Sequence, residues 1–113
     1  MNVNPEQIIA IHNEATAAAQ KAAQDYFKNT LNNKDQFPAG FSWVKIYDVK
    51  LNTKLGKALA AVGFEKAWTK GIELWNPSKF NCQNVDTLYA GSRAYAAVFE
   101  SYGFKVFADS RWD

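Results

Sequence analysis

The residues best suited to chemistry lie in two polar segments, each between a predicted strand and a predicted helix. The first segment is YDVKLNTK, residues 47–54, and the second is WNPSKFNCQNVD, residues 75–86. Each segment runs into the amino end of a helix, where free backbone N–H groups and the helix dipole attract anions. The second segment is also longer than the roughly 2–6 residues that usually join a strand to a helix. If the two segments lie together, they predict an anion-binding site.

The predicted site combines positive charge, neutral hydrogen-bonding groups and an aromatic surface. Charge comes from Lys50, Lys54, Lys57 and Lys79, hydrogen bonds come from Asn52, Asn76, Ser78, Gln83 and Asn84, and Trp75 or Phe80 offers a stacking surface for a base. Such a set is suited to a nucleotide, to another phosphate-bearing ligand or to a peptide carboxylate. A simpler interpretation stays open, in which Asn and Ser cap helices, Pro77 sets a turn and the rest is a solvated loop.

Arg93 is a further ligand-binding candidate, on the predicted last helix. It lies on the side opposite the expected buried stripe, which consists of Leu88, Gly91, Tyr95, Val98 and Tyr102. A guanidinium is suited to phosphate or carboxylate because its planar fork donates two parallel hydrogen bonds. A stacked or ion-paired structural role is the competing interpretation.

Catalysis, a metal site and a resident cofactor find little support in the residue types. The chain has one histidine, His12, and one cysteine, Cys82, far apart in the sequence. A Cys–His zinc site within one chain needs more ligands, and a single cysteine cannot form an internal disulfide. The carboxylates lack a paired spacing typical of acid–base catalysis, and the segment LGKAL lacks the spacing of a P-loop. We therefore expect a binding protein without catalytic residues rather than an enzyme.

The first element of the chain is a predicted long helix within residues 1–32. Asn4 is a suitable cap, Pro5 suits the first helical position, and after it no Gly or Pro intervenes before Leu31. The predicted buried stripe of this helix consists of Ile8, Ile11, Ala15, Ala18, Ala22 and Tyr26. Because the middle of that stripe is alanine, we expect it to pack closely on a sheet or on the same helix of a second copy.

Residues 41–113 contain two half-repeats of strand, helix and strand. We expect strands over 41–49, 64–68, 72–75 and 104–110, a helix that begins at Asn52 or Thr53 and stops at Gly63, and a helix that begins at Asn84 or Asp86 and stops at Gly103. The segments LGKALAAVGFEKAW and YAAVFESYGFKVFA align at their Gly-Phe pairs, which favours an internal repeat.

This order of elements predicts one α+β domain over residues 1–113. Two successive strand-helix-strand units are typical of the ferredoxin-like βαββαβ sandwich or a close variant, here preceded by the long N-terminal helix. In such a sheet we expect the first and third strands to be central, adjacent and parallel. Segments 47–54 and 75–86 would then lie at the same edge of the sheet, which assembles the predicted anion site.

One face of the predicted sheet needs a cover. Strand 41–49 carries large apolar side chains on both faces, because Phe41 and Trp43 alternate with Val44. We expect the N-terminal helix or a second subunit to cover the face that the other helices leave open, and we predict a homodimer. The terminal Trp112 is expected to dock on the body of the protein or on another subunit.

Charge and composition place few limits on the partner. Thirteen basic and eleven acidic residues give a net charge of +2, which permits a nucleic-acid partner without requiring one. The start, MNVNPEQIIAIHNEATAAAQ, has neither the basic beginning nor the apolar core of a signal peptide, and we expect no membrane span. With one free cysteine, the reduced cytosol is the expected compartment.

The run NTKLGKALAAVGFEKAW, followed by LWNPS, QNVD and AGSRAYA, resembles a family of small uncharacterised proteins encoded by tailed bacteriophages. The resemblance covers nearly the whole chain, from the Ala-rich helix to the terminal SRWD. It implies a phage origin and expression in the host cytoplasm, and it transfers no catalytic residue.

In a phage setting we expect a small accessory protein that acts by binding, directed at a host protein or at host defence, with a nucleotide-like ligand at the paired helix ends. The alternative is a single-stranded nucleic-acid-binding module in which aromatic side chains of the sheet stack on bases, namely Phe41, Trp43, Tyr47 and Trp75. The aromatic signature K/R-G-F/Y-G/A-F-V-x-F/Y of one such module is absent from the sequence.

Overall fold

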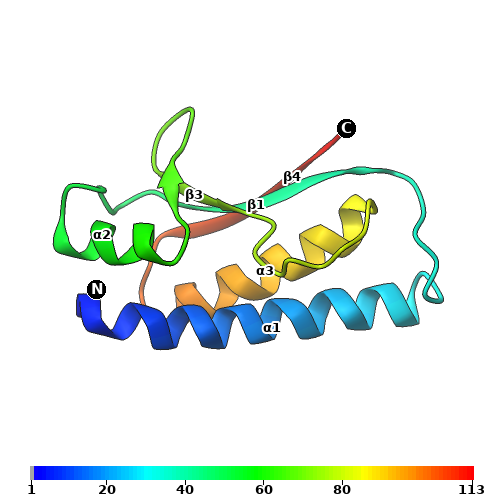
Figure 1. Ribbon diagram of the computed structural model, residues 1–113, viewed down its shortest axis with the longest axis horizontal. Helices are drawn as coiled ribbons and strands as arrows, with labels where there is room; N and C mark the ends of the chain where they lie inside the picture. Colours follow the sequence, from blue (N-terminus) through cyan, green and yellow to red (C-terminus); the bar gives the residue numbers. More distant parts are fainter. Residues whose placement is uncertain (1) are drawn as a thin grey trace.

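The computed structural model describes residues 2–113, and its longest element is the helix at the foot of Figure 1. A short 3-10 turn, η1 (Pro5–Gln7), leads into α1 (Ile8–Asn29). The backbone N–H of Asn4 donates to Oε1 of Gln7 at 2.7 Å, which closes the start of the helix. The predicted long N-terminal helix is therefore confirmed.

The buried stripe of α1 differs from the predicted one in its second half. Ile8, Ile11, Ala15, Ala19 and Ala23 are buried, whereas Ala18, Ala22 and Tyr26 are only half-buried. From Ala15 onward the stripe advances in steps of four residues, because α1 packs along the last helix and ridges of that spacing fit between the side chains of a neighbouring helix. The alanine stripe is thus occupied within the same chain.

The remaining elements follow in the predicted order, with shifted bounds. They are β1 (Gly40–Ile46), α2 (Lys54–Ala61), β2 (Glu65–Lys66), β3 (Ile72–Trp75), α3 (Val85–Ser101) and β4 (Val106–Trp112). Thr53 caps α2, since its Oγ1 accepts from the N–H of Gly56 at 3.0 Å. Asn84, and not Asp86, caps α3. Both helices end before a glycine with positive φ, at Gly63 (118°) and Gly103 (96°), where a residue without Cβ avoids strain.

The four strands form one sheet in the order β2-β3-β1-β4, and every neighbouring pair is antiparallel. The prediction that the first and third strands run parallel is wrong: β1 and β3 pair Trp43 with Trp75 and Ile46 with Ile72. The reason lies in the connections. Helix α2 returns the chain so that β2 runs parallel to β1, and the tight hairpin after β2 then reverses β3.

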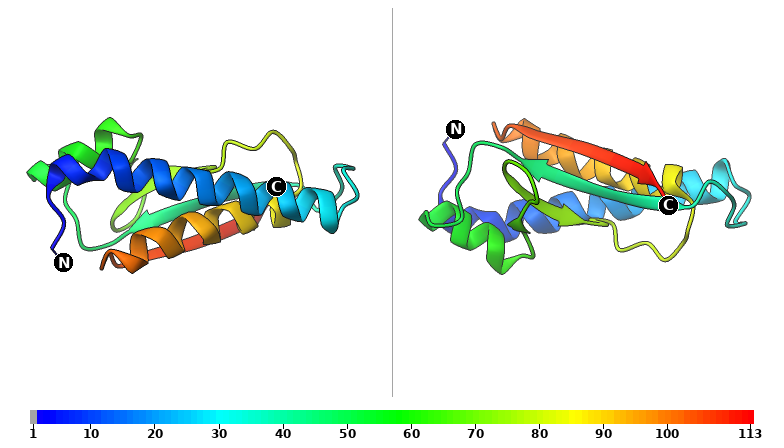
Figure 2. Two further views of the ribbon diagram at one scale, coloured as in Figure 1. Left: turned by 90° about the horizontal axis from the view of Figure 1, so that it is seen from below. Right: turned by 90° about the horizontal axis from the view of Figure 1, so that it is seen from above.

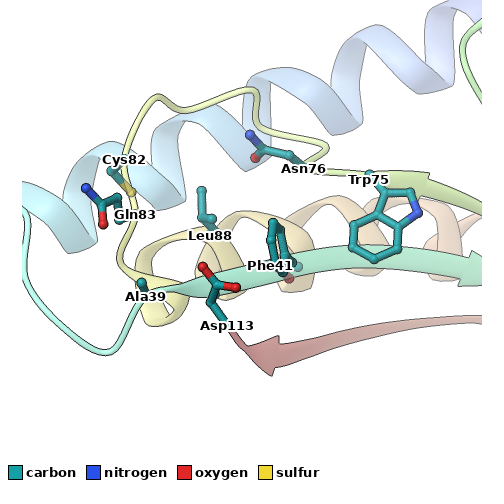
Figure 3. A pocket seen from close by; sticks show the side chains of 10 residues that line it. Ala39, Phe41, Trp75, Asn76, Cys82, Gln83, Leu88 and Asp113 are labelled. Atoms are coloured by element: carbon teal, nitrogen blue, oxygen red, sulfur yellow. The ribbon is translucent and has the colours of Figure 1, made fainter.

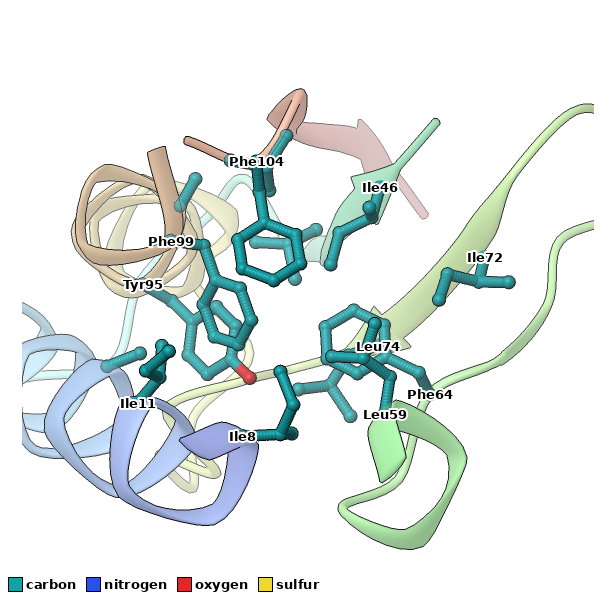
Figure 4. Packing of buried hydrophobic residues seen from close by; sticks show 14 of the residues in the cluster. Ile8, Ile11, Ile46, Leu59, Phe64, Ile72, Leu74, Tyr95, Phe99 and Phe104 are labelled. Atoms are coloured by element: carbon teal, nitrogen blue, oxygen red, sulfur yellow. The ribbon is translucent and has the colours of Figure 1, made fainter. Parts of the chain in front are cut away.

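The helices pack on one face of the sheet, and the core lies between them (Figure 1). Ile46, Ile72 and Leu74 belong to the same core cluster as the rings of Tyr95 and Phe99 of α3 (Figure 4). The rings of Tyr95 and Phe99 are stacked with centroids 5.0 Å apart. The sequence-based expectation of an α+β fold with a helix-covered sheet is confirmed by this arrangement.

The opposite face of the sheet is open in residues 2–113. In the right-hand view of Figure 2, β1, β3 and β4 lie in front and the helices lie behind them. The prediction that α1 could cover this second face is wrong, because α1 packs beside α3 on the already covered side. Cover by a second subunit stays a prediction.

The outer residues of α3 and β4 also depart from expectation. Val98 is half-buried and Tyr102 is exposed, because the buried stripe of α3 passes through Ala96 and Phe99 instead. Trp112 pairs with Gly40 at the end of β4 but its side chain is 75% exposed, so the prediction that it docks on the body of the protein is wrong.

None of the helices in residues 2–113 combines the length and the apolar character that a membrane crossing requires.

Candidate functional site

The two polar segments predicted to form one anion site lie at opposite ends of the sheet. Segment 47–54 follows the end of β1, whereas segment 75–86 returns to its beginning, where the N–H of Gly40 donates to the carbonyl of Gln83 at 3.1 Å. Strand β1 has seven residues, so about 20 Å separates its ends. Figure 1 shows α2 and the start of α3 on opposite sides of the view. The structure therefore does not assemble the predicted paired-helix site.

The lysine group of that prediction surrounds the start of α2. Lys50, Asn52, Lys54 and Lys57 are all exposed there. One free donor of the first turn, the N–H of Gly56, is already paired with Thr53, whose hydroxyl in turn donates to the carbonyl of Lys50 at 2.6 Å. These residues form a solvated positive end of the molecule.

The start of α3 already holds an anion, the carboxylate of Asp35. Its two oxygens accept from the backbone N–H groups of Gln83 at 2.8 Å and Asn84 at 3.0 Å. The side-chain oxygen of Asn84 accepts from the N–H of Thr87 at 2.8 Å. Sequence reasoning missed Asp35, and its only signal was an acid in the polar loop NNKDQFPAG. An external phosphate would have to displace this carboxylate.

Three further candidates have structural contacts. Ser78 is 2% exposed, and its Oγ accepts from the N–H of Phe80 at 3.1 Å. Phe80 packs on Phe27 with ring centroids 5.2 Å apart, so its ring is not a free stacking surface. Buried Asn84 donates from its amide to the carbonyl of Gln36 at 3.0 Å. The simpler interpretation, capping and turn chemistry, fits these three residues. Lys79 is exposed beside them.

Trp75, Asn76 and Gln83 do share a cavity, of about 440 Å³, at the beginning of β1. Figure 3 shows Leu88 at its centre, with Phe41 and Trp75 on one side and Cys82 on the other. The cavity exists because β3 ends at Trp75 and the chain turns away at Asn76, which has a φ of 43°.

The same turn leaves a gap in the hydrogen bonding of β1. Asn76 donates to the carbonyl of Ser42 at 2.8 Å, and Gly40 donates to Gln83, but the N–H of Ser42 and the carbonyl of Gly40 have no partner among residues 2–113. Both groups point toward the β3 side, since alternate residues of an antiparallel strand face the same neighbour. One donor and one acceptor thus border the cavity.

Beside the cavity, the open face of the sheet carries a cluster of aromatic side chains. We call it the aromatic face: Phe41, Trp43 and Tyr47 of β1 and its end, Trp75 of β3, and Phe107 of β4. Trp43 and Trp75 are cross-strand partners with ring centroids 4.7 Å apart. Trp75 also meets Phe41 at 6.2 Å, and Tyr47 meets Phe107 at 5.6 Å. The rings form two contacting groups along the sheet.

Cations and acids alternate with these rings. Lys45 lies 5.6 Å from the centre of the Tyr47 ring, and Arg111 lies 5.6 Å from that of Phe41. Lys70 and Lys105 border a hollow of about 660 Å³ next to Tyr47. The acids of the face are Glu73, which accepts from Nε1 of Trp75 at 3.0 Å, its cross-strand partner Glu65, and Asp109, opposite Trp43. Asp48 borders the same hollow as the two lysines.

A comparison with protein-family models, with curated proteins and with solved structures found no match to this chain. Function therefore has to be inferred from the geometry of the site.

Arg93 belongs to neither the cavity nor the aromatic face. It is exposed on α3, with its guanidinium 5.9 Å from the centre of the Tyr89 ring. The competing interpretation of a stacked arginine fits this contact.

His12 and Cys82 are not a catalytic pair. Nδ1 of His12 is hydrogen-bonded to the hydroxyl of Tyr95 at 2.7 Å, and Thr16 contacts its other ring nitrogen. Burial, and after it the charge of Asp35, raises the pKa of the Cys82 thiol, which disfavours the nucleophilic thiolate. Residues 2–113 contain no group of three His, Cys, Asp or Glu side chains that could hold a metal ion.

Proposed function

We propose that the protein binds single-stranded nucleic acid across the open face of its sheet. The observation that carries the proposal is the aromatic face, in which Trp43 and Trp75 stand side by side on the two central strands. Unpaired bases stack on exposed aromatic rings, and each stacked base contributes about 1–3 kcal/mol. Because every base has a flat face, such a surface binds single strands with little sequence preference.

The fold supports this proposal. We infer a ferredoxin-like arrangement, since β3 lies between the parallel strands β1 and β2 and α2 connects those two, as in a split βαβ unit. Four-stranded sheets of this kind bind RNA through aromatic side chains on their open face. Here the helices occupy the other face, which leaves Phe41, Trp75 and Phe107 exposed and Trp43 and Tyr47 partly exposed.

The charges of the face indicate how the backbone of the nucleic acid would contribute. Lys45, Arg111, Lys70 and Lys105 can reach phosphates. The acids of the face reduce the positive potential, namely Asp48, Glu65, Glu73 and Asp109. We expect binding dominated by stacking, with a shallow salt dependence. Two to four phosphate contacts correspond to a slope of log K against log salt of roughly −1.5 to −3.

The cavity at the beginning of β1 could hold one end of the bound strand. It adjoins Trp75 and Phe41, and the unpaired N–H of Ser42 and carbonyl of Gly40 offer one donor and one acceptor. The edge of a nucleobase presents the complementary groups. We propose that a terminal base of the bound strand enters this cavity.

The test is fluorescence anisotropy with a labelled oligonucleotide of about ten nucleotides, in its single-stranded and duplex forms. We expect the single strand to bind and the duplex to bind far more weakly. Trp43→Ala and Trp75→Ala should each weaken binding roughly 5- to 150-fold, the equivalent of one lost stacking contact. The matched control is Phe37→Ala, because Phe37 is 87% exposed but lies in the loop before β1, away from the aromatic face.

The control variant should bind as the wild type does. An absence of single-strand binding at about 100 µM protein, or equal losses for Phe37→Ala and Trp43→Ala, would overturn the proposal. Unchanged circular dichroism of the tryptophan variants excludes unfolding as the cause of a loss.

A host protein is the second candidate partner for the same face. The near balance of cations and acids between the rings favours it, because aromatic rings with mixed charge are also typical of protein interfaces. In a phage-encoded protein such binding would be host-directed or act against host defence. Pull-downs from nuclease-treated bacterial lysate with wild type and Trp43→Ala separate the two: a protein captured only by wild type, without oligonucleotide binding, supports this second candidate.

A further inference from the structure

Apart from Phe107, the residues on the outer side of the molecule formed by α3 and β4 play no part in the nucleic-acid proposal. We call this side the α3–β4 flank. Tyr89, Arg93, Ala96, Ala97 and Glu100 of α3 and Val106, Phe107 and Ala108 of β4 border a shallow hollow of about 340 Å³ there. Figure 2 shows β4 at the margin of the sheet with α3 directly behind it. This flank thus joins one strand edge to one helix surface.

Strand β4 is an unprotected edge. The backbone groups of Phe107, Asp109 and Arg111 face β1, so those of Val106 and Ala108 face outward. β4 pairs with β1 without a bulge along its seven residues, and it contains neither proline nor lysine, the usual means of blocking an edge. Among residues 2–113, the only outward N–H of β4 with a partner is that of Ser110, which donates to Oδ1 of Asp109 at 2.8 Å. An edge of this kind is a template for another strand.

The exposed surface of α3 beside that edge carries one positive and one negative side chain, at equal distances from the middle of the stripe. Arg93 and Glu100 are seven residues apart, two helical turns, and therefore lie on one stripe. Between them lies exposed Ala97, whose small side chain allows another helix to approach closely, whereas the neighbouring Ala96 is already buried in the core. Neither charge forms a salt bridge with any residue from 2 to 113. The stripe is complementary to itself when a second copy is turned by a two-fold axis through its middle.

We infer that a second copy of this chain binds at the α3–β4 flank. The two α3 helices pack antiparallel at Ala97, and Arg93 of each copy pairs with Glu100 of the partner subunit. The two β4 edges meet antiparallel around Ala108, which extends the sheet from four strands to eight. All of the partner's contacts arise from one self-complementary surface, as closed two-fold symmetry requires.

The dimensions of the elements are consistent with this dimer. Helix α3 packs on both β1 and β4, so its axis lies inside the edge of the sheet. With strands about 4.8 Å apart, the two copies of α3 would be about 10 Å apart, within the range of packed helices. The two aromatic faces would lie on the same side of the extended sheet.

The test is the dimer dissociation constant of charge variants, measured by light scattering over a dilution series. Wild type should show twice the 12.7 kDa mass of the chain. Arg93→Glu and Glu100→Arg each place like charges together and should weaken the dimer about tenfold or more. The double variant Arg93→Glu/Glu100→Arg restores opposite charges and should dimerise as wild type does. This rescue separates an interface from a general loss of stability.

Two further variants complete the test. Lys28→Glu changes an exposed charge on α1, away from the flank, and should leave the dimer unchanged. Ala108→Pro removes one outward N–H without removing a bond to β1 and should also weaken the dimer. Wild type that stays at the mass of one chain at high concentration, or a double variant that stays monomeric while folded, would overturn the inference. The charge variants keep Trp43 and Trp75, so failure of the dimer and failure of nucleic-acid binding remain distinguishable.

Discussion

Both faces of β1 carry apolar side chains, but their surroundings are opposite. On one face Ser42, Val44 and Ile46 are buried under the helices. On the other face Phe41 and Trp43 stay at the open surface, although their rings are larger than those side chains. Alternation along a strand thus separates a structural face from an accessible one within seven residues.

The difference shows that apolar character alone does not decide burial in this sheet. Trp75 is 40% exposed and Phe107 is 53% exposed. Contacts between neighbouring rings hide part of each aromatic surface, as for Trp43 and Trp75 at 4.7 Å. Contiguous exposed aromatic surface is uncommon on monomeric proteins, which supports the proposed binding site on this face. The covered face should therefore govern stability and the open face should govern binding.

The largest effect is expected from truncating one phenylalanine on each face. Phe99→Ala removes a ring that is fully buried between Tyr95, Phe64 and Phe104, and it should lower the free energy of unfolding by about 3–5 kcal/mol. Phe107→Ala, on the open face, should lower it by about 1 kcal/mol or less. Urea unfolding of both variants measures the two values. Equal losses would remove the distinction between the faces.

A smaller effect is expected from two tyrosine hydroxyls. Tyr95 is buried and its hydroxyl is hydrogen-bonded to His12 at 2.7 Å, so Tyr95→Phe should cost about 0.5–1.5 kcal/mol of unfolding free energy. Tyr47→Phe changes the matching residue of the open face and should leave stability within about 0.5 kcal/mol of wild type. Thermal melts of the two variants test this pair. A larger loss for Tyr47→Phe would mean that its hydroxyl has a structural partner.

The smallest effect is expected in the pH dependence of stability, through His12 on the covered side. Burial, and after it the positive charge of Lys79, lowers the pKa of His12 below its ordinary value of 6.5. The unfolded chain therefore binds this proton at a higher pH than the folded one, so the contribution to stability is present above pH 6.5 and is lost as the pH falls through the lowered pKa. His12→Gln should remove this part of the pH dependence.

The measurement is a series of thermal melts from about pH 7.5 to about pH 5 for wild type and His12→Gln. Parallel curves for the two proteins would contradict the expected role of His12. Lys79→Ala offers a sharper comparison, since it removes the second cause of the lowered His12 pKa. It should therefore reduce the pH dependence of stability without abolishing it.

Local patterns were sufficient to predict most elements. Asn4 and Pro5 at the start of the first helix, Thr53 and Asn84 as caps, and Gly63 and Gly103 as stops act within a few residues of their own position. The α+β class follows from their order. Helix caps and glycine stops can be predicted because they depend on the backbone geometry of a few neighbouring residues.

The predicted site failed where it depended on long-range pairing. Segments 47–54 and 75–86 were joined by assuming that β1 and β3 run parallel, whereas the hairpin after β2 makes them antiparallel. Sequence periodicity contains no information on strand direction. Asp35 was overlooked for the same reason, because it acts on Gln83 and Asn84 from a distant loop. Of the predicted residues, only Trp75, Asn76 and Gln83 meet in one cavity.

The position of β1 in the sheet has a consequence for how the chain folds. Both of its neighbours, β3 and β4, follow it in the sequence, and Gly40 at its start pairs with Trp112 near the end of the chain. During synthesis on the ribosome, β1 can therefore pair with β3 first, but its other side remains unpaired until the last strand has emerged. Such late, long-range closure slows folding and exposes strand edges to aggregation in the meantime. We expect chains interrupted before β4 to be handled by chaperones or proteases rather than to fold.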